Sequence, residues 1–75
     1  MSRLPRGLPA KKVVRALARA GFYVRRRRGG SHMILRRDQP YAQVVVPDHR
    51  SLDTGTLDNI LEGAGLTIDQ FLDLL

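Results

Sequence analysis

Residues 25–37 read Arg25-Arg26-Arg27-Arg28-Gly29-Gly30-Ser31-His32-Met33-Ile34-Leu35-Arg36-Arg37, which are two strand-like runs separated by a pair of glycines. Both central positions of a two-residue hairpin turn need positive φ angles, which glycine adopts without steric cost, so Gly29-Gly30 predicts a β-hairpin. The turn also fixes the pairs across the hairpin: Arg28 with Ser31, Arg27 with His32, Arg26 with Met33, Arg25 with Ile34, Val24 with Leu35 and Tyr23 with Arg36.

This register divides the hairpin into two surfaces, because paired side chains share a face and neighbours along a strand alternate. The first surface is apolar and is expected to face the core: Phe22, Val24, Met33 and Leu35. The second surface is mainly cationic: Tyr23, Arg25, Arg27, His32 and Arg36. Ile34 is the only apolar residue on it. We therefore expect one imidazole among guanidinium groups on an open surface.

The segments around the hairpin predict three helices and one more strand. Pro9 and the apolar spacing of residues 10–20 indicate a helix that ends at Gly21, with Phe22 folding back on the last turn. A turn at residues 38–40 leads to a strand over 41–46, and residues 1–8 are expected to be a loose arm. Thr54 is the expected N-cap of a helix over residues 55–64. Thr67 and Gln70 form a capping-box pattern that starts a last short helix.

These elements predict an α+β fold in the order helix, three antiparallel strands, helix and short helix. A chain of 75 residues is expected to form a single domain over residues 1–75 with a thin core. If the helices cover one face of the three-stranded sheet, the other face stays open. The register places His32 on that open face.

The charge distribution predicts a polyanionic partner. The net charge is +6, and twelve of the thirteen Lys and Arg residues precede Asp38, whereas all seven acidic residues lie from Asp38 onward. Such a one-sided basic field is typical of nucleic-acid binders, although a basic face that is merely solvated is the competing interpretation. No apolar run is long enough to span a bilayer or act as a signal peptide, so we expect a cytoplasmic protein without membrane contact.

The remaining chemistry points to proton transfer without a metal. The chain has no cysteine, and its two histidines and scattered carboxylates do not show metal-ligand spacing. Ser31 and His32 are neighbours in the predicted strand and should point to opposite faces, which argues against a serine hydrolase. RNA carries its own nucleophile, the 2′-hydroxyl, so cleavage needs a proton acceptor, a proton donor and cations around the phosphate. His32 could transfer the proton, with Tyr23 or a lysine of the first helix as open choices for the second group.

A bland interpretation competes with this one at each histidine. His32 could be an ordinary half-exposed strand residue beside arginines, since lone histidines are common and rarely catalytic. His49, in the loop after Pro47, is better explained by a turn or packing role. The arginines are more secure as phosphate contacts than as catalytic groups.

The order of motifs along the chain resembles the HicA family, also called YcfA-like proteins, which are small mRNA interferase toxins of toxin–antitoxin systems. The motifs are Ala20-Gly21-Phe22, Gly30-Ser31-His32, Val46-Pro47-Asp48-His49, Gly55-Thr56-Leu57 with Ile60-Leu61 and Ala64-Gly65-Leu66, and the end Phe71-Leu72 with Leu74-Leu75. Together they cover nearly the whole chain. Two departures from the family pattern are the added Gly29 before the Gly-Ser-His motif and the acidic residues Asp58 and Glu62 in the second helix.

The resemblance implies a double-stranded-RNA-binding-domain-like α-β-β-β-α fold and ribosome-independent cleavage of mRNA without a metal. It implies that His32 is the catalytic residue and that a HicB-like antitoxin covers this surface. We therefore expect an endoribonuclease toxin that needs no cofactor, with His32 as general acid/base. The residues expected to hold RNA phosphates are Lys12, Arg25, Arg27, Arg28 and Arg36. The alternatives are a non-catalytic RNA-binding module that uses the same basic sheet face, and a structural basic protein of a larger ribonucleoprotein.

Overall fold

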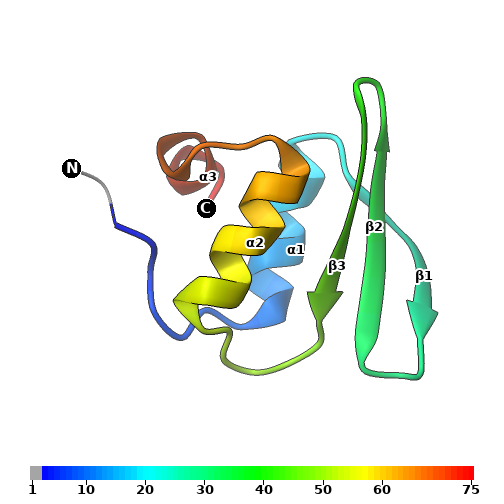
Figure 1. Ribbon diagram of the computed structural model, residues 1–75, viewed down its shortest axis with the longest axis horizontal. Helices are drawn as coiled ribbons and strands as arrows, with labels where there is room; N and C mark the ends of the chain where they lie inside the picture. Colours follow the sequence, from blue (N-terminus) through cyan, green and yellow to red (C-terminus); the bar gives the residue numbers. More distant parts are fainter. Residues whose placement is uncertain (1–2) are drawn as a thin grey trace.

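The computed structural model describes residues 3–75. Its elements follow in the order α1 (Ala10–Arg19), β1 (Tyr23–Arg28), β2 (His32–Asp38), β3 (Tyr41–Pro47), α2 (Thr54–Ala64) and α3 (Ile68–Leu74) (Figure 1). The strands form one antiparallel sheet in the order β1-β2-β3, and the helices gather on one side of it (Figure 1). This confirms the predicted α+β fold with a double-stranded-RNA-binding-like layout and an open sheet face.

The core lies between the sheet and the helices, and every element except β1 contributes a fully buried side chain to it. These side chains include Leu17 of α1, Leu35 of β2, Val46 of β3, Leu57 of α2 and Phe71 of α3. Burial of apolar area of this kind is the main favourable term in folding. Within residues 3–75, no helix combines the length and apolarity that crossing a membrane requires.

Helix ends couple the helices to the strands, largely as the sequence predicts. After α1, Gly21 has a φ of 95°, the Gly21 N–H donates to the Ala18 carbonyl, and the Phe22 N–H donates to the Leu17 carbonyl at 3.0 Å. This is the predicted Schellman-type ending, and it sends the chain directly into β1. At the start of α3, Thr67 and Gln70 form both hydrogen bonds of the predicted capping box.

The N-cap of α2 differs from the prediction. Asp53, not Thr54, precedes the helix, and its Oδ1 accepts the Thr56 N–H at 2.6 Å. That hydrogen bond lowers the pKa of Asp53, because it stabilises the ionised carboxylate. Both residue types cap helices well, and the chain places the ionisable one at the positive end of the helix dipole.

The segment before α1 is also more ordered than the loose arm that we predicted for residues 1–8, of which residues 1 and 2 lie outside the described residues. Leu4 and Leu8 pack against the core, and the Leu8 carbonyl accepts the Leu52 N–H at 2.8 Å. The Ala10 N–H donates to the His49 carbonyl at 2.9 Å. The loop before α2 and the start of α1 are therefore tied together, and His49 contributes through its backbone.

The hairpin register is only partly as predicted. The pairs Tyr23 with Arg36 and Val24 with Leu35 are confirmed, but beyond them a bulge at Arg25 shifts the pairing by one residue. The pairs near the turn are Arg26 with Ile34, Arg27 with Met33 and Arg28 with His32. The loop therefore has three residues, Gly29, Gly30 and Ser31, rather than two. A bulged strand turns every side chain beyond the bulge to the opposite face from the one predicted.

Candidate functional site

The sheet surface that faces away from the helices carries most of the candidate residues, and we call it the outer face. Its members, taken from the strand pairing, are Tyr23, Arg26 and Arg28 of β1, His32, Ile34, Arg36 and Asp38 of β2, and Tyr41, Gln43 and Val45 of β3. Ile34 is only 3% exposed although it lies outside the core cluster. The outer face is thus a flat polar and cationic surface around one apolar centre.

His32 lies on the outer face at the start of β2, as predicted, and its side chain is exposed. Its neighbours across the strands are Arg28 on β1 and Pro47 on β3. The ring is placed by Ser31, whose Oγ lies 3.3 Å from His32 Nδ1. Within residues 3–75 no other hydrogen bond reaches the ring, so Nε2 is open to a ligand from solvent.

The Ser31 contact corrects the sequence-based argument that Ser31 and His32 point to opposite faces. Ser31 belongs to the loop and not to β2, so the alternation of a strand does not apply to it. The hydroxyl hydrogen-bonds one ring nitrogen and orients the imidazole. A hydrogen bond at one nitrogen selects which nitrogen presents a proton or a lone pair to a ligand.

The bulge rearranges the arginines around His32. Arg26 and Arg28 lie on the outer face, whereas Arg27 lies on the helix side, opposite Met33. Arg27 forms an ion pair with Asp48 at 2.7 Å and lines a groove of about 380 Å³ with Lys11 and Arg15 of α1 among others. The predicted placement of Arg27 beside His32 is therefore wrong. Arg26, which the sequence register paired with Met33 on the core side, is instead an outer-face cation.

Two further predicted phosphate contacts are not strand neighbours of His32. Arg25 is the bulge residue and lacks a partner in the register with β2. Lys12 is exposed on α1, which covers the opposite face of the sheet, and it lines a groove of about 230 Å³ with Arg15 and Leu75 among others. The sheet therefore separates Lys12 from His32. Of the predicted cations, Arg28 and Arg36 are placed on the outer face with the imidazole by the strand pairing.

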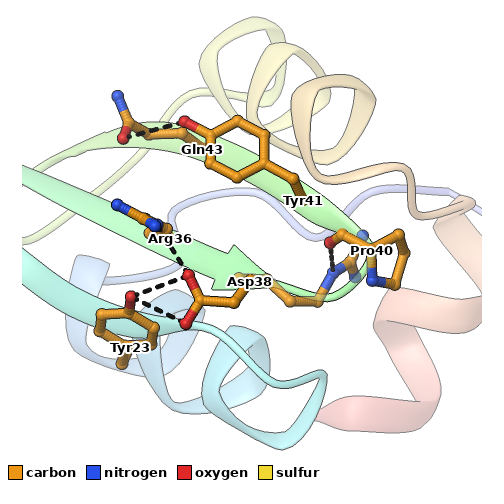
Figure 2. A network of polar contacts seen from close by, with 7 residues as sticks. Tyr23, Arg36, Asp38, Pro40, Tyr41 and Gln43 are labelled. Carbon is orange, nitrogen blue, oxygen red and sulfur yellow. Dashed lines mark hydrogen bonds and ion pairs between the residues drawn. The ribbon is translucent and has the colours of Figure 1, made fainter.

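Arg36 is engaged by other residues of the outer face (Figure 2). Its Nε donates to Asp38 Oδ1 at 2.8 Å, and its guanidinium lies 5.5 Å from the centroid of the Tyr41 ring. The hydrogen bond to Asp38 raises the pKa of Arg36, with a smaller electrostatic contribution from Tyr23. Arg36 thus stays charged, and part of its charge is neutralised by Asp38.

Arg37 has a clear structural role. Its guanidinium lies 4.7 Å from the Phe22 ring centroid, and it donates to the Pro40 carbonyl at 2.9 Å and to the Ala64 carbonyl at 3.3 Å. Ala64 ends α2, where a cation is favoured by the helix dipole. Arg37 therefore links β2, the following turn and α2.

No group of three His, Asp or Glu side chains that could hold a metal ion exists within residues 3–75. The sequence profile of the family described as HicA toxin of bacterial toxin–antitoxin systems matches residues 10–66. The chain belongs to the HicA toxin family. No protein in a search of curated proteins matches it. The part of the chain that the family profile matches includes α1, the whole sheet and α2. It therefore includes the outer face and the loop that carries Ser31.

Membership of the family makes this HicA protein the toxin of a toxin–antitoxin pair, whose partner in HicA systems is a HicB-type antitoxin. The resemblance to the HicA family that the motifs indicated is thereby confirmed. The toxin role follows from the family, whereas the set of residues on the outer face follows from the strand register of this chain.

Proposed function

We propose that this protein is an endoribonuclease that cleaves mRNA without a metal, with His32 as general acid/base. The observation that carries the proposal is an exposed imidazole at the end of an open cationic sheet face, hydrogen-bonded to Ser31 at Nδ1 and accessible at Nε2. A flat open face suits a long polymeric substrate better than a deep pocket would.

The chemistry needs little more than proton transfer and charge stabilisation. His32 Nε2 takes the proton from a ribose 2′-hydroxyl, the 2′-oxygen bonds to phosphorus, and the bond from phosphorus to the 5′-oxygen breaks as that oxygen takes up a proton. The products are a 2′,3′-cyclic phosphate and a 5′-hydroxyl. Cations beside the phosphate stabilise the charge that develops on its oxygens.

We assign this electrostatic role first to Arg28, the strand neighbour of His32, and to Arg26, the next outer-face arginine of β1. Arg36 lies further along the face. Arg25, Arg27 and Lys12 act as secondary phosphate contacts for parts of the RNA that pass the β1 edge, because they lie at the bulge or on the helix side. We further propose that the HicB-type antitoxin inhibits the enzyme by covering the outer face.

The test is cleavage of a single-stranded RNA in a metal chelator, compared with the same strand carrying one 2′-deoxynucleotide at the cleaved position. We expect the RNA to be cut with a 2′,3′-cyclic phosphate end and the substituted strand to remain intact at that bond. Equal cleavage of both strands would contradict the proposed chemistry. Tight RNA binding without any cleavage would favour the non-catalytic RNA-binding module instead.

A further inference from the structure

Both tyrosines of the chain lie on the outer face, at the end opposite His32. The chain contains two tyrosines and no tryptophan. Tyr23 is 45% exposed and Tyr41 is 64% exposed, and they lie on β1 and β3 with β2 between them. Clustered exposed aromatic rings on a protein surface mark interaction sites. The proposed cleavage chemistry at His32 does not use either ring.

Polar contacts hold the two rings in place (Figure 2). The Tyr23 hydroxyl donates to the Asp38 carboxylate, at 3.1 and 3.2 Å from its two oxygens, and Arg36 Nε donates to the same carboxylate. The Arg36 guanidinium in turn lies over the Tyr41 ring. One face of Tyr41 is therefore supported by the cation while most of the ring remains open. A surface that is already ordered loses less conformational entropy when a ligand binds.

We propose that Tyr41, backed by Arg36, is a stacking site for an unpaired nucleobase of single-stranded RNA. The proposal rests on the proposed function, because it names the form of RNA that the enzyme takes and the part of the face that reads it. Sequence-dependent recognition of RNA generally uses unpaired bases that stack on aromatic rings and on arginine planes. Tyr41 and Arg36 offer both in one stack.

The spacing along β2 sets which base the site reads. Tyr41 pairs with Asp38, which lies six residues from His32 on β2, about 20 Å, and an extended RNA strand covers that distance in roughly three nucleotides. Gln43 lies beside the site, and its Oε1 accepts a long hydrogen bond of 3.5 Å from the Tyr41 hydroxyl. Its amide N–H groups can donate to acceptors on the edge of the stacked base. The site therefore influences which base lies about three nucleotides from the cleaved bond.

Charge favours RNA over a protein as the occupant of this surface. The stacking site continues directly into the outer-face arginines Arg26 and Arg28. The one outer-face carboxylate, that of Asp38, is already engaged by Arg36 and the Tyr23 hydroxyl. A polyanion thus meets a net positive surface with aromatic rings at one end, which is the combination found in grooves that bind single strands.

The experiment uses intrinsic fluorescence of a His32→Ala, Tyr23→Phe double variant, in which Tyr41 is the only tyrosine. Because the chain has no tryptophan, its emission reports on Tyr41 alone. The protein is titrated with a single-stranded RNA of about eight nucleotides and, separately, with inorganic polyphosphate. We expect RNA to change the Tyr41 emission and polyphosphate to bind without changing it, because only RNA has bases to stack.

A matched pair of variants in the His32→Ala background tests the energetics. Tyr41→Leu removes the ring and should weaken RNA binding about tenfold while leaving polyphosphate binding unchanged. Tyr23→Phe keeps both rings and removes only the hydroxyl bond to Asp38, so it should weaken RNA binding less than Tyr41→Leu does. Circular dichroism of each variant checks that the fold is retained, and the emission titration does not depend on altering Tyr41.

RNA binding that leaves the Tyr41 emission unchanged would overturn the stacking site. The same holds if the emission responds only to a HicB-type antitoxin, because the surface would then belong to a protein interface. Cleavage is measured separately on the unmodified chain. If the protein cleaves RNA but RNA does not change the Tyr41 emission, only the stacking site is contradicted. If RNA changes the Tyr41 emission but is not cleaved, only the proposed enzymatic activity is contradicted.

Discussion

The two strand pairings of β2 differ sharply in regularity. With β3, all seven residues of β2 pair in continuous register, from His32 with Pro47 to Asp38 with Tyr41. With β1, the register slips by one residue at Arg25. Every residue of β1 is exposed, whereas β2 and β3 bury Met33, Leu35, Val44 and Val46 on their helix side. Register is strictly set only where one side of a strand pair is buried.

The physical reason is the cost of a slip. Moving β3 by one residue against β2 would turn buried valines to water, which costs apolar burial at several positions. After Val24, β1 consists of four arginines, so a shift exchanges one exposed arginine for another. The bulge is therefore inexpensive, and it decides which arginines face the imidazole.

The largest predicted effect is a difference in the free energy of unfolding between a substitution in β2 and one in β1. Leu35→Ala, at a fully buried site of β2, should lower the free energy of unfolding by about 3 kcal/mol through lost burial and a cavity. Val24→Ala, across from it on β1 and 43% exposed, should cost less than about 1 kcal/mol. Urea denaturation measures both. Equal losses would mean that β1 is as firmly packed as the centre of the sheet.

The second prediction uses adjacent arginines that the bulge places on different faces. Arg26→Ala should reduce the rate of RNA cleavage about tenfold, because it removes a charge-assisted contact from the outer face. Arg27→Ala should reduce the rate far less, since its side chain pairs with Asp48 on the helix side. The two variants have the same net charge, so they control for the general field. A larger loss of cleavage rate for Arg27→Ala would contradict the bulged register and favour the register predicted from a two-residue turn.

The smallest effect concerns the loop that closes the β1 and β2 pair. Gly30 has a φ of 77°, and a Cβ placed there meets no atom within 4 Å. Gly30→Ala should therefore cost only the conformational strain of a positive φ, about 1 kcal/mol, without a steric clash. Hydrogen exchange of the β3 amides that bond to β2 should be slow in the unmodified protein and should stay as slow in this variant. Loss of protection in β3 would show that the hairpin loop and the β2 and β3 pair unfold together.

Local signals in the sequence were sufficient for most of the fold. The end of α1 could be predicted from Leu17, Gly21 and Phe22 alone, and the start of α3 from Thr67 and Gln70. Both helix ends depend on hydrogen bonds between residues a few positions apart. The N-cap of α2 was displaced by one residue because two good capping types are adjacent there. The ordering of residues 3–8 was not predicted, because it depends on a hydrogen bond from Leu52, which is distant in the chain.

The site was less predictable, because it depends on loop length. The open face and the place of His32 on it followed from the alternation of β2. The neighbours of His32 did not, since four identical arginines carry no information about register. The contact between Ser31 and His32 followed from the third loop residue. The added glycine before the Gly-Ser-His motif was the available signal for a longer loop. The toxin role came from the family match and not from any residue alone.

The central claim is that the imidazole on the outer face cleaves RNA, and the two histidines of the chain provide the most direct test. Initial cleavage rates of His32→Ala and His49→Ala should be compared with that of the unmodified protein on one single-stranded RNA. Both side chains are exposed, and His49 holds its loop through its backbone, so both variants should fold. We predict that His32→Ala loses detectable cleavage while His49→Ala retains most of it. Cleavage by His32→Ala at the unmodified rate would contradict the account.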